Sequence, residues 1–142
     1  MDLVHSIFHN EDVPYEVMGV GVEVPEVVDS ERFKKKYNLD NYLIYVGRID
    51  EGKDCPRLFK YFIEYKRRVK SDLKLVLMGK AVCDIPKSPD IISLGFVSEE
   101  DKFDGIKGAK ALILPSKFES LSISVLEAMT LSKRSIRLCG CP

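Results

Sequence analysis

Residues 109–132 read AKALILPSKFESLSISVLEAMTLS, and this stretch decides the fold. Its first part, 109–115, is an apolar run of the kind that forms a strand buried on both faces of a parallel sheet. The residues that follow predict a helix whose first turn is built of Ser120, Leu121 and Ser122. A strand that leads into a helix is the repeating unit of an α/β domain.

The same strand pattern occurs three more times upstream, and each run reaches a glycine at or near its end. The three runs are YLIYVG at 42–47, LKLVLMGK at 73–80 and IISLG at 91–95. Continuous apolar runs of this length, without polar alternation, are typical of strands that are covered on both faces. Four parallel strands are therefore expected.

Helical segments separate these strands. Their expected N-caps are Ser30, for a short charged helix through Tyr37, Asp54, and Ser98, which has Asp101 three residues later. Pro56 falls in the first turn of the second helix, where a missing N–H costs nothing. The apolar face of that helix is expected to contain Leu58, Phe59, Phe62 and Ile63. Because strand and helix alternate throughout, we predict an α/β domain, a Rossmann-like three-layer sandwich with a mainly parallel sheet.

The two ends of the chain are less regular. Residues 1–30 contain prolines and glycines that break helices, and we interpret them as a linker, so that the domain itself covers residues 31–142. Near the C-terminus, Ile136 and Leu138 could begin a fifth strand. This strand would leave an uncovered sheet edge, which is a template for pairing with another chain and raises the hypothesis of a dimer.

Composition limits the classes of function. The chain has 142 residues, 45% of them hydrophobic and 31% charged, which suits one globular domain. Its 22 basic residues balance 22 acidic ones, so no overall positive field would attract nucleic acid or an anionic membrane. An anionic ligand must therefore be held by a local arrangement of groups.

Zinc binding, secretion and membrane spanning are all disfavoured. The four cysteines, Cys55, Cys83, Cys139 and Cys141, show no C-x-x-C pair and no histidine at a zinc-ligand spacing. No basic segment followed by an apolar run opens the chain, and no 18 apolar residues occur together. We expect reduced thiols, no bound metal and a cytoplasmic location.

Arg48 and Lys53 are candidate phosphate ligands, because they follow the strand-terminal Gly47 on a loop that leads into a helix. Arginine supplies a bidentate fork and lysine a mobile point charge, so the two could straddle a diphosphate. The competing interpretation is a pair of surface charges, with Arg48 bound to Asp50 and Lys53 bound to Glu51. The spacing alone favours this second interpretation.

Two acids, Glu119 and Glu127, bracket the start of the helix predicted after the fourth strand. Glu127 lies on an otherwise apolar helix, where its partner could be either a ligand hydroxyl or an internal cation. A glycoside hydrolase also uses two carboxylates, but these must face one another across the scissile bond. Since the backbone N–H groups at a helix start bind phosphate, ligand binding fits this stretch better than hydrolysis.

These motifs, in this order, resemble the C-terminal domain of the family 4, or group 1, retaining glycosyltransferases. The matching elements are Gly47 and Arg48 with Lys53, the strand ending at Gly79, LGFVSEED at 94–101, and the acids of an E-x(7)-E motif after Pro115. The resemblance covers roughly residues 40–132 and implies one half of a GT-B fold. Three departures stand out: serines at 120 and 122 in place of glycines, the segment SKRS at 132–135, and the absence of a preceding α/β domain.

The resemblance implies a site for a nucleotide-sugar donor. Arg48 and Lys53 would neutralise the diphosphate, and Glu119 would contact hydroxyls of the transferred sugar. Backbone N–H groups of Ser120, Leu121 and Ser122 would hold phosphate, and Glu127 would bind the ribose. Gly95, Phe96 and Val97 would pack on the base. Transfer would proceed with retention, without a bound metal or other cofactor.

The resemblance also implies that the chain is a fragment of a hexosyltransferase. Residues 1–30 would be the linker and the remnant of a preceding acceptor-binding domain, the C-terminus would be truncated, and the fragment would be inactive by itself. The alternative is a non-catalytic Rossmann-like regulatory or assembly module derived from such an enzyme. A sugar-nucleotide epimerase is a third candidate. The donor base, the sugar, the acceptor, the oligomeric state and any peripheral membrane association of a full enzyme are left open.

Overall fold

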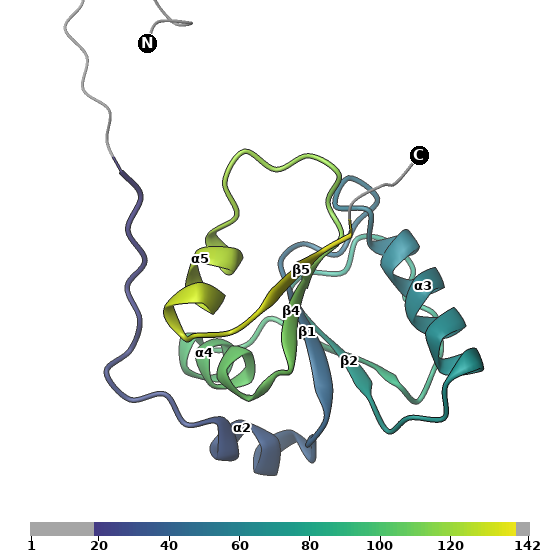
Figure 1. Cartoon of the computed structure of the whole chain (residues 1–142), viewed down its shortest axis with the longest axis horizontal. Coiled ribbons are helices and arrows are strands. Elements are labelled where there is room, and N and C mark those ends of the chain that lie inside the picture. Colours follow the sequence, from purple (N-terminus) through teal and green to yellow (C-terminus); the bar gives the residue numbers. More distant parts are fainter. Residues whose placement is uncertain (1–18, 139–142) are drawn as a thin grey trace, which may run out of the picture.

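The computed structural model describes residues 19–138, which fold around one sheet of five parallel strands (Figure 1). The strands are β1 (Tyr42–Val46), β2 (Lys74–Met78), β3 (Ile91–Gly95), β4 (Ala111–Leu114) and β5 (Ser135–Arg137). The helices are α2 (Ser30–Tyr37), α3 (Cys55–Arg68), α4 (Glu99–Gly108) and α5 (Ile123–Thr130). None of these helices has the length and apolar character that crossing a membrane requires.

The strand order is β3-β2-β1-β4-β5, so the chain builds the sheet outward from β1 in two directions. It first adds β2 and β3 on one side, and then returns past β1 to add β4 and β5 on the other. The order therefore reverses between β1 and β4. In open α/β sheets, ligands bind outside the carboxyl ends of the strands at such a reversal.

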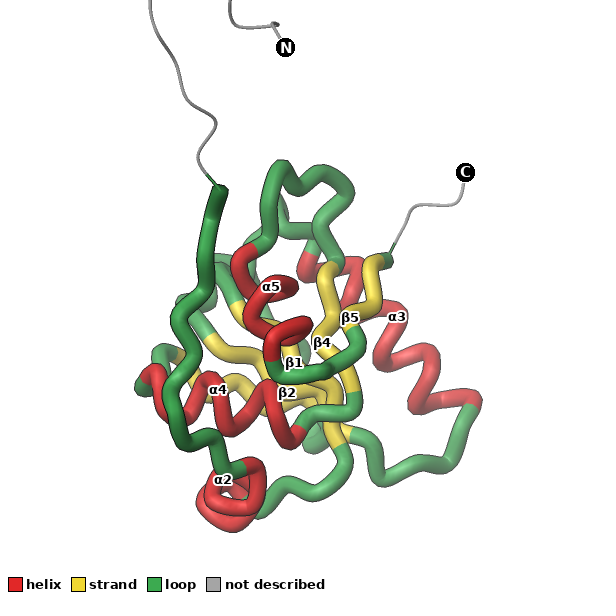
Figure 2. Tube along the Cα trace, turned by 60° about the vertical axis from the view of Figure 1, so that its left-hand side comes forward, coloured by secondary structure: helices red, strands yellow, loops and turns green. Residues whose placement is uncertain are grey.

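The helices cover both faces of the sheet, as the predicted three-layer sandwich requires. Figure 1 shows α3 on one side of the strands, whereas α2, α4 and α5 lie on the other side. Figure 2 shows the same grouping from a second direction. The fold class predicted from the apolar runs is thus confirmed.

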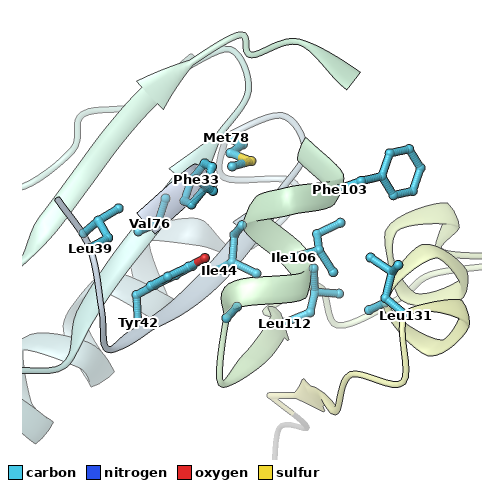
Figure 3. Packing of buried hydrophobic residues seen from close by; sticks show 12 residues of the cluster. Phe33, Leu39, Tyr42, Ile44, Val76, Met78, Phe103, Ile106, Leu112 and Leu131 are labelled. Atoms are coloured by element: carbon cyan, nitrogen blue, oxygen red, sulfur yellow. The ribbon is translucent and has the colours of Figure 1, made fainter. Parts of the chain in front are cut away.

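Alternate strand residues supply two separate hydrophobic cores. In β1, Tyr42 and Ile44 pack toward α2 and α4, whereas Tyr45 packs toward α3. Figure 3 shows the first of these cores, in which the buried side chains include Phe33, Leu39, Tyr42, Ile44, Val76, Met78, Phe103, Ile106, Leu112 and Leu131. Burial on both faces explains why the strands are uniformly apolar rather than alternating.

One connection departs from the predicted alternation of strand and helix. Residues 79–90 join β2 to the neighbouring parallel strand β3 without forming a helix. This segment contains Pro86 and Pro89, and each lacks the N–H that a helix interior needs. The prediction of a helix after every strand was therefore wrong at this position.

For α2, α3 and α4, the predicted caps and apolar faces agree with the structure except at two caps and one side chain. Ser98 caps α4 as expected, since its side chain accepts a hydrogen bond from Asp101 N. Asp29, not Ser30, caps α2, because its carboxylate accepts a hydrogen bond from Glu31 N. Asp54 occupies the N-cap position of α3, but its side chain makes no capping hydrogen bond. On the same helix Ile63 is 43% exposed and does not belong to the apolar face.

The fifth strand predicted near Ile136 is present as β5, which pairs with β4 at the edge of the sheet. All three of its residues are exposed, so this edge is uncovered within the described part of the chain. Residues 19–29 form neither helix nor strand and run into α2, which suits a linker. The linker prediction for residues 1–18, and the expectation of reduced thiols at Cys139 and Cys141, lie outside the described residues.

Gly79 marks the point where the ends of β1 and β2 approach most closely. Its φ is +133°, and a Cβ added there would lie 2.1 Å from the carbonyl oxygen of Gly47. The obstructing atom belongs to the backbone and cannot rotate away. Only glycine fits this position without moving a strand end.

We expect Gly79→Ala to destabilise the domain by at least about 2 kcal/mol, because strained backbone and a backbone collision add together. Gly95→Ala is the matched control. Gly95 also has a positive φ, of +67°, but nothing lies within 4 Å of its added Cβ. This control should lose only about 1 kcal/mol. Urea unfolding of the two variants measures the difference, and equal losses would show that the collision is not a real constraint.

Candidate ligand site

The ends of the first three strands form a tight, glycine-lined edge. Gly47 N donates a hydrogen bond of 2.9 Å to Met78 O, and Gly79 N donates one of 2.7 Å to Gly95 O. The three glycines that end these strands, Gly47, Gly79 and Gly95, all have positive φ values. Because no side chain projects from these positions, a ligand could approach the backbone closely here.

The β4–α5 connection is a loop rather than the predicted start of a helix. Residues 115–121 are not helical, and α5 begins at Ile123 with Ser122 as its N-cap. The Ser122 hydroxyl accepts a hydrogen bond from Val125 N, at 3.4 Å. Glu119 therefore lies before the helix, as predicted, but four residues ahead of its first residue instead of directly before it, so the predicted start of the helix was wrong. Figure 2 shows this loop extending beyond the edge of the sheet.

An ion pair joins this loop to the segment that follows β1. Lys53 Nζ lies 2.9 Å from Glu119 Oε1 and 3.1 Å from Glu119 Oε2. The alternative pairing of Lys53 with Glu51 is therefore not what the structure contains. The contact connects two predicted site residues that are 66 positions apart in the sequence. The ammonium group of Lys53 lowers the pKa of the Glu119 carboxyl group below its ordinary value.

Asp50 contacts both residues that were predicted to supply cations, Arg48 and Lys53. Its carboxylate binds the Arg48 guanidinium and accepts a hydrogen bond of 2.7 Å from Lys53 N. The Lys53 N–H first, and then Arg48, lower the pKa of Asp50. The expected surface pair between Arg48 and Asp50 is thus present. Asp50 is only 8% exposed, however, and the hydrogen bond that it accepts from Lys53 N also fixes the turn that carries Lys53.

Two arginines hold the backbone of the β4–α5 loop. Arg57 Nη2, on α3, donates hydrogen bonds of 3.0 Å to Pro115 O and to Leu138 O. Arg137 Nη2, on β5, donates one of 2.7 Å to Lys117 O. With the Lys53–Glu119 pair, three cations thus bind the first five residues of the loop. Its geometry depends on α3 and β5 as much as on its own sequence.

A first cavity, of about 380 Å³, opens over the glycine-lined edge. It is lined by Val46, Gly47, Arg48, Met78, Gly79, Lys80, Phe96, Val97, Glu99 and Lys102. Three cations and one carboxylate therefore surround this space, which suits an anionic ligand. Phe96 is 82% exposed and offers a free aromatic face. The structure thus brings the predicted residues Gly47, Arg48, Phe96 and Val97 together.

A second cavity, of about 300 Å³, lies beside the β4–α5 loop. Its lining includes the predicted residues Glu119, Ser120, Leu121 and Ser122, together with Arg137. The start of α5 also contacts the end of β1, because Ser124 Oγ donates a hydrogen bond of 3.2 Å to Val46 O. The candidate site therefore consists of two cavities on either side of the contact between β1 and α5.

Glu127 lies behind these cavities and lines neither of them. It is 6% exposed, and Lys102 Nζ binds its Oε1 at 2.8 Å. Of the two partners considered for this acid, the internal cation is the one that the structure contains. A role for Glu127 toward a ligand hydroxyl remains a prediction.

Sequence reasoning missed several residues that shape the site. Asp50 was expected only as a surface partner of Arg48. Lys102, Arg57 and Arg137 make the contacts described above, yet each is a single charge in a charge-rich segment. Only their long-range partners distinguish them, and a single sequence does not reveal partners. Within residues 19–138, no group of three or more His, Cys, Asp or Glu side chains could hold a metal ion.

A protein-family model described as glycosyl transferases group 1 matches residues 28–136. Among curated proteins, alpha-D-kanosaminyltransferase from Streptomyces kanamyceticus is 30% identical, over a match that covers 70% of this chain. That match covers only 28% of the relative.

Solved structures show the same fold. The glycosyltransferase WaaG, involved in lipopolysaccharide biosynthesis, superposes with a TM-score of 0.62 at 17% identity, over 83% of this chain and 34% of its own. Sucrose-phosphate synthase from Thermosynechococcus elongatus gives 0.59 at 18% identity, over 80% and 32%. The C-terminal domain of a Francisella tularensis group 1 glycosyl transferase gives 0.57 at 17% identity, over 78% and 70%. The chain thus spans about a third of the longer relatives.

We expect Lys53→Met to return the pKa of Glu119 toward its ordinary value, because Lys53 is the main cause of the lowered pKa. The Lys53–Glu119 pair stabilises the fold at pH values above the pKa of glutamate in the unfolded chain, which is about 4.3. This stabilisation is lost as the pH falls through the lower folded pKa. Carboxyl-carbon NMR titration of Glu119 measures the change. Arg48→Met, which removes a partner of Asp50, is the control and should leave the Glu119 titration in place.

Proposed function

The chain belongs to the group 1 glycosyl transferases, and we propose that it is the part of such an enzyme that binds a nucleotide-sugar donor. The parent enzyme would have the GT-B fold and would transfer a hexosyl group to an acceptor with retention of configuration. The observation that carries the proposal is the pairing of Lys53 with Glu119 at the carboxyl edge of the sheet. This pair would put Lys53, the proposed ligand of the diphosphate, beside Glu119, the proposed ligand of the sugar hydroxyls.

The diphosphate would bind between the two cavities. Arg48 lines the first cavity with its side chain largely exposed, so its guanidinium fork is accessible to phosphate oxygens. Lys53 uses two of its three N–H donors on Glu119, and the third is left for a phosphate. The first backbone N–H groups of α5 and of Ser120, Leu121 and Ser122 would complete the phosphate site.

The nucleoside would occupy the first cavity and the sugar the second. Phe96 and Val97 would pack on the base, because both line the first cavity and Phe96 is largely exposed. Glu119 would accept hydrogen bonds from hydroxyls of the transferred sugar, and the ribose would extend toward Glu127. In this arrangement the predicted residues together would contact the base, the ribose, the diphosphate and the sugar of one donor molecule.

During transfer, the acceptor oxygen would bond to the anomeric carbon on the face that the nucleoside diphosphate leaves, and the proton of the acceptor hydroxyl would pass to the departing diphosphate. Negative charge then accumulates on the departing diphosphate, where Arg48 and Lys53 would stabilise it. No side chain would form a covalent bond to the sugar. The acceptor would be held by a separate domain, so the described domain would bind the donor but would not complete the transfer alone.

Calorimetry with UDP, GDP, ADP and their sugars tests the proposal directly. We expect at least one of them to bind with a dissociation constant below 1 mM. Arg48→Met and Lys53→Met should each weaken the binding of that nucleotide and of inorganic diphosphate by about tenfold or more, because each removes a charged hydrogen bond. Arg67→Met is the control, since Arg67 is an exposed partner of Glu64 on α3.

Absence of binding by every nucleotide at millimolar concentration would contradict a donor-binding function. That outcome would instead favour the non-catalytic module. The serines at positions 120 and 122, and the segment 132–135, are the features that support this alternative.

A further inference from the structure

The side chain of Lys102 lies between the proposed nucleoside cavity and the buried acid Glu127. Lys102 lines the cavity of about 380 Å³ together with Gly47 and Phe96. Its Nζ is 2.8 Å from Glu127 Oε1, on the neighbouring helix α5. The lysine therefore connects the wall of the cavity to a carboxylate that does not itself line the cavity.

The contact with Glu127 is shielded from water, unlike most ion pairs of this chain. The side chains of Lys102 and Glu127 are 16% and 8% exposed. A second carboxylate, Glu99, also lies 2.7 Å from Lys102 Nζ, but its side chain is 77% exposed. Exposed pairs contribute little, whereas removing one member of a buried pair leaves a costly uncompensated charge. Glu127 is thus the partner that fixes Lys102.

The backbone around Lys102 places its side chain beside the proposed base-packing residues. Lys102 N donates a hydrogen bond of 2.9 Å to Ser98 O in the first turn of α4. That turn directly follows Phe96 and Val97. The ammonium also lies 4.6 Å from the centre of the Phe103 ring, a cation–π distance. The same short segment thus carries the proposed base-packing residues and the cation that binds the proposed ribose ligand.

Lys102 is charged at neutral pH despite its partial burial. Burial by itself would lower the pKa of Lys102, but the hydrogen bonds to Glu127 and Glu99 outweigh it and raise the pKa. An ammonium group has three N–H donors, and these two acids occupy two of them. The third is available to an acceptor atom in the cavity.

We propose that Lys102 is a positioning residue that orients Glu127 for the ribose of the donor; this rests on the proposed function. In this arrangement Lys102 occupies Glu127 Oε1 and holds the carboxylate, so that Oε2 is the oxygen that accepts hydrogen bonds from the ribose hydroxyls. Recognition of the nucleoside then depends on the pair, whereas recognition of the diphosphate depends on Arg48 and Lys53.

A double-mutant cycle on ligand binding tests this inference. The variants are Lys102→Met, Glu127→Gln and the double variant, each titrated with the best-binding nucleoside diphosphate and with inorganic diphosphate. We expect Lys102→Met to weaken binding of the nucleoside diphosphate by about tenfold, as loss of a charged hydrogen bond does. Inorganic diphosphate should change by less than about twofold. In the Glu127→Gln background, Lys102→Met should have no further effect, because it acts through Glu127.

Three further measurements keep the result interpretable. Lys107→Met removes an exposed lysine from the same helix and should bind like the unchanged chain. Lys102→Arg retains the charge and should keep more affinity than Lys102→Met. Thermal unfolding identifies loss of the fold, and the double variant, which removes both members of the pair, then reports on the site even where Lys102→Met alone is unstable.

Several outcomes would overturn the inference. Unchanged nucleoside diphosphate binding by Lys102→Met would show that the pair is structural only. Equal weakening of inorganic diphosphate would indicate a general loss of positive charge, and additive losses in the double variant would mean that Lys102 acts independently of Glu127. If the unchanged chain binds no nucleoside diphosphate, the proposed function fails and the inference fails with it.

Discussion

The ion pair between Lys53 and Glu119 is the contact on which the geometry of the site depends. It joins the turn after β1 to the loop after β4, two segments that follow the pair of strands where the sheet order reverses. Without it, the side-chain hydrogen bonds that hold this loop would come from Arg57 of α3 and Arg137 of β5, and none of them would reach the turn after β1. Asp50, which binds Lys53 N, and the glycines at the strand ends then fix the backbone of the turn after β1.

Most of the buried acids in the described domain pair with a cation from a different element. Asp101 and Asp104 of α4 have Lys36 and Arg32 of α2, and Glu127 of α5 has Lys102 of α4, whereas Asp50 has the nearby Arg48. Burying these groups unpaired would be costly, so the pairs define how the helices dock on one another. At the carboxyl edge of the sheet the same kind of pairing also leaves donors and acceptors directed at open cavities. Fold stability and the proposed ligand binding would therefore share the same residues there.

Local sequence signals predicted the fold well. Apolar runs ending at Gly47, Gly79 and Gly95 identified three strands, and the Ser98 cap located α4, because these features depend on neighbouring residues only. The start of α5 was misplaced because Ser120, Ser122 and Ser124 are equally good caps by composition, and contacts from α3 and β5 decide among them. The partners of Lys53 and Glu127 also lie far away in sequence, so no local pattern could identify them.

The most direct measurement is a crystal structure of this chain with the nucleoside diphosphate that binds it most tightly. The account predicts that the diphosphate lies within hydrogen-bonding distance of Arg48, of Lys53 and of the start of α5. The base should pack on Phe96 and the ribose should lie toward Glu127. A nucleotide bound elsewhere, for example in the apolar groove lined by Leu58, Phe62 and Ile113, with no contact to Lys53, would contradict the proposed donor site.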